Sequence, residues 1–498
     1  MRPRVLALGA LLALAAPTAA AAAEIDATGE ERIRDPEPRK RHWIRAAEEV
    51  FVINGPIGTV WYWSNANFNQ ADWDLRWDWP SWRRKIVTFD ALRFDSNDFG
   101  TNAFNHSLSG AAYYWTARSN GLSIAQSFLM ANIGSITWEY VVEYKEYPSL
   151  NDVIFTPIVG IPFGEGLYQL GELFDRGSNA IPVRILAEVF GFPRKLHDRI
   201  DGSEAGRAPD TDALGLPRDT YHRFVLSSGI ARASQAGRPD SSRAELGLDT
   251  EVVTLPHYGG PGHAGGFVTD RGFTRFSIDI ALGDKRVERI GVSARASLFG
   301  YYHQAVRDRH GASVFVGAAT EFEYAERWVG EVLDRLAIVR VASAAADTTL
   351  HAGPVRIRAN LDVSPDFAMI TSLAWPAWLA TDKPASKSVL HMKGYYYAVG
   401  LSVLPTVTFT TADLEAGFAA KWEVFTSIDG VDRFQENIVD DARLTDHRLE
   451  WRAFFGVHAV GPLHLSASVT ERHRASAVSG FTSTSVERTL AATARLVL

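Results

Sequence analysis

The chain has 498 residues, a net charge of −7 with acidic and basic residues interspersed, and no cysteine. The lack of cysteine excludes disulfides, thiol nucleophiles and thiolate metal sites, and the charge balance gives no sign of nucleic-acid binding. A mean hydropathy of −0.08 does not separate a soluble protein from a membrane barrel, because half of every barrel strand faces a polar lumen.

The N-terminus predicts export. A basic start precedes an apolar run from Val5 to Ala16, and small residues follow as far as Ala23. This is the pattern of a signal peptide, so we expect residues 1–23 to be cleaved. The charged, proline-containing residues 24–42 predict a flexible lead-in. Later in the chain, residues 122–142 come nearest to a membrane-spanning helix, but they carry too many polar groups.

A Trp-rich and helical domain is expected over residues 43–200. Half of the fourteen tryptophans lie between Trp43 and Trp82. Interfacial tryptophans favour the depth of lipid headgroups, so a membrane-surface segment is one interpretation. Aromatic packing of a small domain against the mouth of a barrel is the interpretation we favour.

Three helices are predicted within this domain, over residues 102–118, 122–144 and about 149–174. The third contains Pro157 and Pro162, which predict a broken helix because proline removes a backbone donor. A shorter amphipathic segment covers residues 181–200. Residues 201–219, rich in glycine, proline and aspartate, predict a linker.

From residue 220 to residue 498 apolar residues recur at every second position. Leu449, Trp451 and Phe455 alternate with Arg448 and Glu450, for example. Such a period places one set on each face of a strand, one meeting an apolar medium and the other water. We predict a mainly β fold, a transmembrane antiparallel barrel of about 12 strands (10–14) in the bacterial outer membrane, with the helical domain packed in or under it. The competing fold is a soluble sandwich, whose strands average about 5–6 residues.

Some details of the barrel follow from single segments. Residues 354–363 and 367–375 are predicted as two strands, and the glycine-rich residues 257–272 as a long outward loop. Gly283-Asp284 and Gly461-Pro462 have the composition of periplasmic turns.

Polar residues line the apolar helices. Ser135, Glu139 and Glu143 fall at spacing four in the second helix and share one face. A buried carboxylate needs a partner, and His106 is the first candidate for Glu139, with Arg118 the next.

The order of these motifs resembles a known family. Asn102-Ala103-Phe104-x-His106-x-x-x-Gly110, Trp138-Glu139-Tyr140 and Ser149-x-Asn151-Asp152 carry the resemblance, together with Gly164-Glu165. They are similar to an uncharacterised bacterial outer-membrane family, domain of unknown function 3943, over residues 95–175. In that family a proline often follows the histidine, where this chain has Ser107. The resemblance implies an exported outer-membrane protein with no established activity.

The sequence predicts an outer-membrane barrel protein whose helical domain is held by a buried polar network. Its expected partner is outer-membrane lipid, and its role in envelope or lipid homeostasis or in solute passage stays open. The residues of the predicted network are Asn102, Tyr113, Arg118, Trp138, Glu143, Asn151, Asp152 and Glu165.

Two alternatives use the same residues. An enzyme acting on envelope lipid, an acyl hydrolase or acyltransferase, would take Ser135 as nucleophile, His106 as base and Glu139 as orienting group. A metal site would add carboxylates suited to calcium or magnesium. With one histidine and no tight ligand spacing, the sequence predicts no metal and no cofactor.

Overall fold

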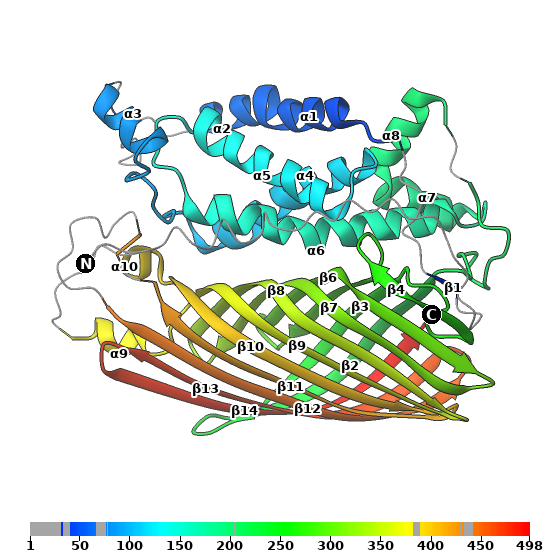
Figure 1. Cartoon of the computed structure of the whole chain (residues 1–498). Helices are drawn as coiled ribbons and strands as arrows, with labels where there is room; N and C mark the ends of the chain where they lie inside the picture. Colours follow the sequence, from blue (N-terminus) through cyan, green and yellow to red (C-terminus); the bar gives the residue numbers. More distant parts are fainter. Residues whose placement is uncertain are drawn as a thin grey trace.

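The computed structural model describes residues 31–32, 40–65, 76, 78–203, 206–381, 389–428, 430–432 and 442–498. It consists of an N-terminal helical domain and a C-terminal β-barrel (Figure 1). The predicted signal peptide and most of the predicted lead-in lie outside the described residues, as do Trp73 and Trp77. The last helix before the barrel, α8, ends at Asp201, and the first barrel strand begins at Tyr221.

Twelve antiparallel strands close into a barrel, which confirms the predicted fold and strand number. The pairing of β14 with β2 closes the cylinder, so the barrel has no open edge. Strands of up to 21 residues are far longer than those of a soluble sandwich. The barrel strands are β2 (Tyr221–Gln235), β3 (Ser241–Val253), β5 (Phe273–Leu282), β6 (Val287–Arg307), β7 (His310–Val329), β8 (Val332–Ala352), β9 (Val355–Ile370), β10 (Tyr396–Thr410), β11 (Leu414–Ser427), β12 (Leu444–Val460), β13 (Leu463–Val478) and β14 (Phe481–Val497).

The structure differs from the predicted strands at β9. The two predicted strands are one, which passes through Pro365 and ends at Ile370. Proline cannot donate to a ladder, and the pairing of β9 with β8 is interrupted between Arg340 and Ala344, opposite this proline. Trp375, placed in a strand by the sequence, begins the short helix α9 (Trp375–Leu379).

Two further expectations about the connections are corrected. The glycine-rich loop contains a strand, β4 (Gly262–Val268), which pairs with β6 and, in parallel, with β1 (Glu31–Arg32). Gly283-Asp284 follows β5, whereas Gly461-Pro462 follows β12. Because successive strands alternate in direction, these turns lie at opposite ends of the barrel, so they cannot both be periplasmic.

The helical domain is built on α6, which runs without a break from Leu150 to Asp175. The predicted break at Pro157 and Pro162 is therefore wrong. Ser149 caps the helix, as predicted, by accepting a hydrogen bond from the amide of Asp152 at 3.3 Å. By length and composition α6 could cross a membrane, contrary to the expectation that no segment could, but 67% of its apolar window is buried.

Most other helices of the domain lie on the side of α6 away from the barrel (Figure 1). The helices of the domain are α1 (Trp43–Val52), η1 (Ile53–Gly58), α2 (Thr59–Asn65), α3 (Trp79–Ile86), η2 (Thr101–Asn105), α4 (His106–Ser119), α5 (Ile124–Thr137), η3 (Trp138–Val142), α7 (Ile181–Phe190) and α8 (Phe192–Asp201). The short helix α10 (Val389–Lys393) follows α9 at the end of the barrel (Figure 1). The η segments are single π-helical turns that continue an α-helix. Trp63 and Trp82 pack on Tyr144 within this domain, with ring centroids 5.5 Å and 6.4 Å apart.

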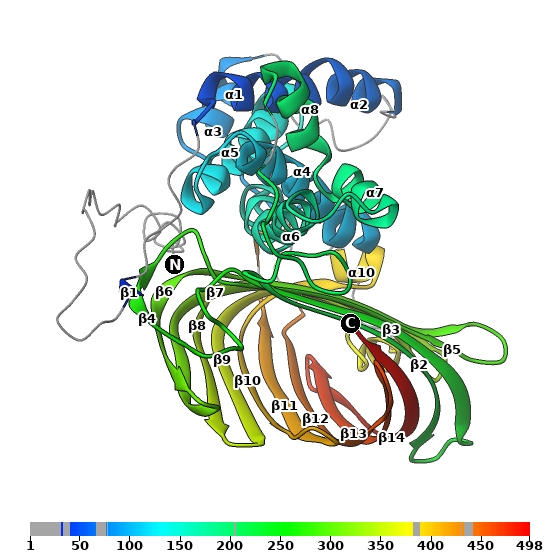
Figure 2. The same ribbon diagram turned by 90° about the vertical axis from the view of Figure 1, so that its right-hand side faces the viewer.

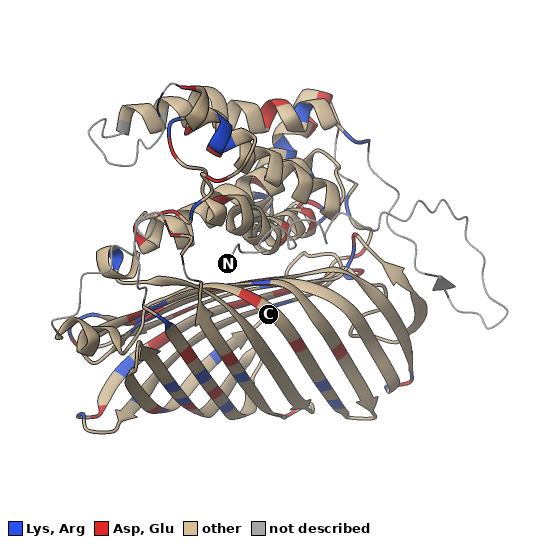
Figure 3. Ribbon diagram, turned by 60° about the vertical axis from the view of Figure 1, so that its left-hand side comes forward, with Lys and Arg blue, Asp and Glu red and all other residues tan. Residues whose placement is uncertain are grey.

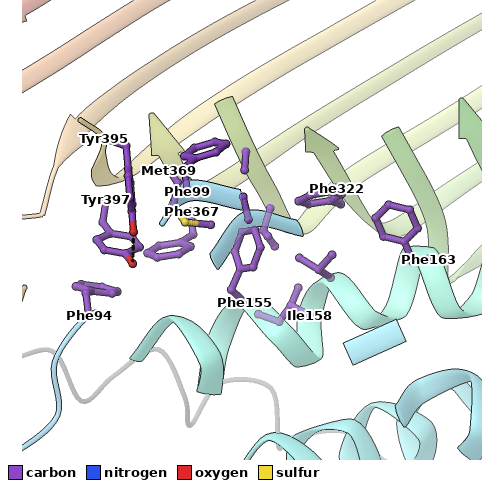
Figure 4. Close-up of a cluster of buried hydrophobic side chains, with 14 of the residues drawn as sticks. Phe94, Phe99, Phe155, Ile158, Phe163, Phe322, Phe367, Met369, Tyr395 and Tyr397 are labelled. Carbon is purple, nitrogen blue, oxygen red and sulfur yellow. Dashed lines mark hydrogen bonds between the residues drawn. The ribbon is translucent and has the colours of Figure 1, made fainter. Parts of the chain in front are cut away.

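The helical domain lies against the outer wall of the barrel, and not in or under it as predicted (Figures 1 and 2). Phe322 of β7 stands between Glu321 and Glu323, whose side chains enter the lumen and pair with cations there. Alternation therefore turns Phe322 outward, where its ring lies 5.8 Å from that of Phe155 and 5.3 Å from that of Phe163 on α6. Figure 4 shows this apolar contact along α6.

Two glycines let α4 and α6 approach closely. A Cβ at Gly160 would lie 2.5 Å from the carbonyl oxygen of Gly110, and a Cβ at Gly110 would lie 1.8 Å from that of Thr156. Neither position can hold a side chain without moving a helix.

We expect Gly160→Ala to lower the free energy of unfolding of the helical domain by about 1–3 kcal/mol, because the helices must separate. Gly166→Ala in the same helix is the matched control, since no atom lies within 4 Å of its new Cβ. It should leave stability unchanged or raise it by about 0.5–1 kcal/mol. Denaturant titration followed by near-UV circular dichroism would measure both, and equal effects of the two variants would contradict the packing described.

Candidate functional site

The centre of the predicted polar network is an ion pair between two helices. His106, the first residue of α4, places its Nδ1 2.6 Å from Oδ1 of Asp152 on α6. The side chain of Asp152 is 4% exposed and that of His106 17%. The Nε2 atom of His106 is buried and has no hydrogen-bond partner among the described residues. The partner expected for His106, Glu139, is thus replaced by Asp152.

Glu139 lies on the other side of Asp152. Its Oε2 accepts a hydrogen bond from the amide of Ser149 at 2.6 Å, and its carboxyl group is in hydrogen-bond contact with that of Asp152. Only 1% of Glu139 is exposed. The three residues of the predicted triad therefore all contact Asp152, His106 and Glu139 through its side chain and Ser135 through its backbone carbonyl. They do not form a chain from serine to histidine to carboxylate.

Ser135 has a partner that does not activate it. Its hydroxyl donates to the backbone carbonyl of Asp152 at 2.6 Å. A nucleophilic serine instead directs this proton to a base. The geometry gives no support to the predicted acyl transfer, and the catalytic role of Ser135 stays a prediction.

Burial changes the acid–base properties of this site. It raises the pKa of Glu139 well above its usual value, and the carboxylates of Asp152 and Glu143 raise it further. Burial alone would lower the pKa of His106, but the carboxylates of Asp152, Asp95 and Glu143 together outweigh this effect and raise it to about 9.

A second part of the network lies one helical layer away. Arg118 donates to both oxygens of Glu165, at 2.7 Å and 2.9 Å. Tyr114 and Gln169 donate to the same carboxylate at 2.8 Å and 2.6 Å. The donor groups of Arg118, Tyr114 and Gln169 thus converge on the Glu165 carboxylate, and this part of the network stabilises the packing of α4 on α6.

The remaining predicted network residues have local partners. Trp138 donates from Nε1 to Glu143 at 2.8 Å. Tyr113 donates to Asn54, which the sequence did not suggest. Asn151 accepts from the amide of Asp95 at 2.8 Å.

Asn102 connects the site to the barrel. Its amide donates to the hydroxyl groups of Tyr395 and Tyr397, at 2.9 Å and 2.8 Å. Tyr397 in turn donates to the backbone carbonyl of Asp95 at 2.7 Å. The sequence missed both tyrosines, since nothing in a local pattern joins residues nearly 300 positions apart.

Asp95 and Lys85 were also missed. One ligand atom each of Asp95, His106 and Asp152 lie within 4.8 Å of one another. The ammonium of Lys85 donates to the carbonyl oxygens of Glu139 and Glu143, at 2.9 Å and 3.0 Å, and so satisfies the end of η3.

The lumen of the barrel is a second polar region. Charged residues occur at many positions along its strands (Figure 3). Two cavities of about 490 Å³ and 560 Å³ share Asp249, Lys421 and Arg452 in their walls. A third, of about 190 Å³, shares Arg358 with the larger one and reaches the turn residue Asp413. A polar space therefore runs along the lumen to the mouth near the C-terminus.

Ion pairs cross this space. Arg358 of β9 binds Glu251 of β3 at 2.7 Å, and these strands lie on opposite sides of the barrel. Arg474 of β13 similarly binds Asp334 of β8. The lumen is thus constricted by side chains and is not a wide pore.

An apolar stopper closes the end of the lumen that lies away from the C-terminus. Trp375 and Trp378 of α9 stack with ring centroids 4.7 Å apart, and each is 7% exposed. They pack on inward-facing apolar residues of the surrounding strands. These are Leu336, Ile338, Ala368, Ile370, Tyr396, Ala398, Phe425, Leu444 and Val478.

Comparison with known proteins supports the resemblance seen in the sequence. Residues 91–192 match the family model described as Domain of unknown function (DUF3943), which confirms the resemblance predicted from residues 95–175. No curated protein matches the chain significantly.

Several solved structures resemble the barrel. The outer membrane channel DcaP of Acinetobacter baumannii is 11% identical, covers 58% of this chain and 100% of its own, and has a TM-score of 0.22. The outer membrane protein OprD from Pseudomonas aeruginosa is 8% identical, covers 56% of this chain and 94% of its own, and scores 0.19. The translocator domain of the autotransporter NalP from Neisseria meningitidis is 9% identical, covers 63% of this chain and 97% of its own, and has a TM-score of 0.22. At such scores the barrel assignment depends on the strand ladder of this chain and not on these neighbours.

We expect Glu165→Leu to destabilise the helical domain by about 3–5 kcal/mol, because it leaves the Arg118 cation buried without its partner. The double variant Arg118→Met/Glu165→Leu should recover most of this loss, since it removes both charges. Glu188→Leu is the control: its partner Arg199 has a 60% exposed side chain, so the change should cost less than about 1 kcal/mol. Thermal unfolding of the three variants would decide, and no recovery in the double variant would show that the pair stabilises beyond charge compensation.

Proposed function

We propose that this chain is an integral protein of the bacterial outer membrane and that its barrel is a gated passage for small polar solutes. The outward face of the strands supports the membrane part of this proposal. Ile230, Phe455 and Leu490 are 72%, 52% and 57% exposed there. Hydrocarbon favours such a wall and water does not, so outer-membrane lipid is the partner that we propose for it.

The polar cavities that adjoin one another along the lumen are the observation that supports passage. A lumen filled for stability alone needs no cavities of about 490 Å³ and 560 Å³ beside its charged side chains. Charged walls are suited to hydrated ions and polar solutes, because they replace part of the hydration of the solute.

The stopper and the cross-lumen ion pairs make the described state a closed one. An apolar constriction excludes water and blocks ions even where side chains leave some space. Trp375 and Trp378 belong to the connection between β9 and β10, and not to the ladder. They could be displaced without breaking a strand pairing, which makes this connection the gate in our proposal.

We expect the purified protein to give little current in planar lipid bilayers and Trp375→Ala/Trp378→Ala to give resolved conductance steps. The control is Trp422→Ala/Trp451→Ala, which removes two tryptophans from strand positions whose side chains point away from the lumen. It should behave like the unaltered protein. Heat-modified migration in gels would verify that each variant keeps a folded barrel. A folded stopper variant that stays silent would refute the gate.

An envelope-lipid enzyme is the second candidate. One observation favours it: Asp152 orients the His106 ring, and Nε2 has no hydrogen-bond partner among the described residues. Above the raised pKa of His106 this ring could act as a general base. Release of fatty acid from phospholipid vesicles that is lost in His106→Ala and kept in Ser135→Ala would support a water-activating base, and release lost in both would support the predicted triad.

A further inference from the structure

Three groups that could bind a metal ion meet at the site around His106. A carboxylate oxygen of Asp95, a ring nitrogen of His106 and a carboxylate oxygen of Asp152 lie within 4.8 Å of one another. They come from the segment before η2, from α4 and from α6, so three separate parts of the chain meet here. Asp152 and Asp95 are 3% and 5% exposed.

Glu139 provides an independent indication of a ligand. It is 1% exposed, and its carboxyl group faces that of Asp152. Within the part of the chain that the structure describes, its Oε1 has no hydrogen-bond partner. Two carboxylates are both acceptors, so their contact requires a proton or a cation between them.

Other buried atoms of the same helices lack a hydrogen-bond partner. Nε2 of His106, Oδ1 of Asn102 and Oγ1 of Thr156 are buried without a hydrogen-bond partner among the described residues. Asn102 precedes His106 by one helical turn, and Thr156 follows Asp152 by one turn. Buried polar atoms are nearly always satisfied, so the unpartnered Nε2 of His106, itself a possible ligand atom, points to a missing bound group.

We propose that Asp95, His106 and Asp152, whose ligand atoms meet within 4.8 Å, bind one divalent transition-metal ion, Zn²⁺ or Mn²⁺. Glu139 lies outside this group of three, beside Asp152, and in our proposal it completes the site from that side. An imidazole nitrogen with carboxylate oxygens suits these ions better than Ca²⁺ or Mg²⁺, which prefer all-oxygen ligands. The proposal replaces the sequence-based expectation of no metal. It is independent of the proposed passage, because the site lies outside the lumen.

The ion would hold the helical domain on the barrel. It would join α4, α6 and the segment carrying Asp95, and that segment contacts the wall through Tyr397. Binding at such a junction stabilises the docked arrangement of the domain over any arrangement in which the ligands separate.

The test uses untagged full-length protein in detergent, stripped with EDTA and titrated calorimetrically with Zn²⁺, Mn²⁺ or Ca²⁺ alone. We expect one Zn²⁺ or Mn²⁺ per chain, with affinity at least about tenfold weaker in His106→Ala and in Glu139→Gln. His222→Ala is the matched control, because His222 also pairs with an aspartate, Asp212 at 3.0 Å, but lies outside this site. It should bind metal like the unaltered protein.

The Glu139→Gln variant distinguishes a bound metal ion from a proton shared between Glu139 and Asp152. Glutamine removes a ligand oxygen and supplies an N–H donor to Asp152 without changing the shape of the side chain. If a proton joins the two carboxyl groups, this variant should be as stable as the unaltered protein and neither should bind metal, which would overturn the proposal. Tighter binding of Ca²⁺ than of Zn²⁺ and Mn²⁺ would overturn the assigned class of metal. Circular dichroism would verify that each variant is folded.

Discussion

The contact between α6 and the outer wall of the barrel is the constraint on which the arrangement of this chain depends. Phe322 packs on α6, while Glu321 and Glu323, its neighbours in β7, pair with cations in the lumen. A slip of one residue in the ladder would press glutamates against an apolar helix and turn a phenylalanine into the polar lumen. The same alternation therefore fixes the register of the barrel and the position of the helical domain.

This contact also brings a buried polar site to the barrel surface. Asn102 bonds Tyr395 and Tyr397, so the helix that carries His106 is held by the wall as well as by α6. The connection between β9 and β10 ends at Tyr395, the residue before β10. This connection therefore contacts the helical domain through the hydrogen bond between Tyr395 and Asn102. The stopper belongs to that same connection. The two polar regions of the molecule are thus joined by one short segment of chain.

The barrel could be predicted from the sequence because each strand carries its own evidence in a period of two. The position of the helical domain could not, since an outward phenylalanine has the same surroundings in sequence whether lipid or a helix covers it. Phe322 is fully buried and Trp422 is 43% exposed, yet both stand between charged residues in the sequence. Within the site, His106 and Asp152 were both identified but given other partners. The spacing along one helix says which residues share a face, and not which residue of another helix meets that face.

The two buried charge clusters of the molecule differ in balance. In the lumen, carboxylates meet guanidinium groups directly, as Glu251 meets Arg358 and Asp362 meets Arg295. In the helical site Glu139 and Asp152 face each other, and the nearby Lys85 directs its ammonium to backbone carbonyl oxygens. Charges removed from water persist only when they are compensated. The lumen is compensated by its own side chains, whereas the contact between Glu139 and Asp152 places two acceptors together and needs a proton or, as we propose, a bound cation between them.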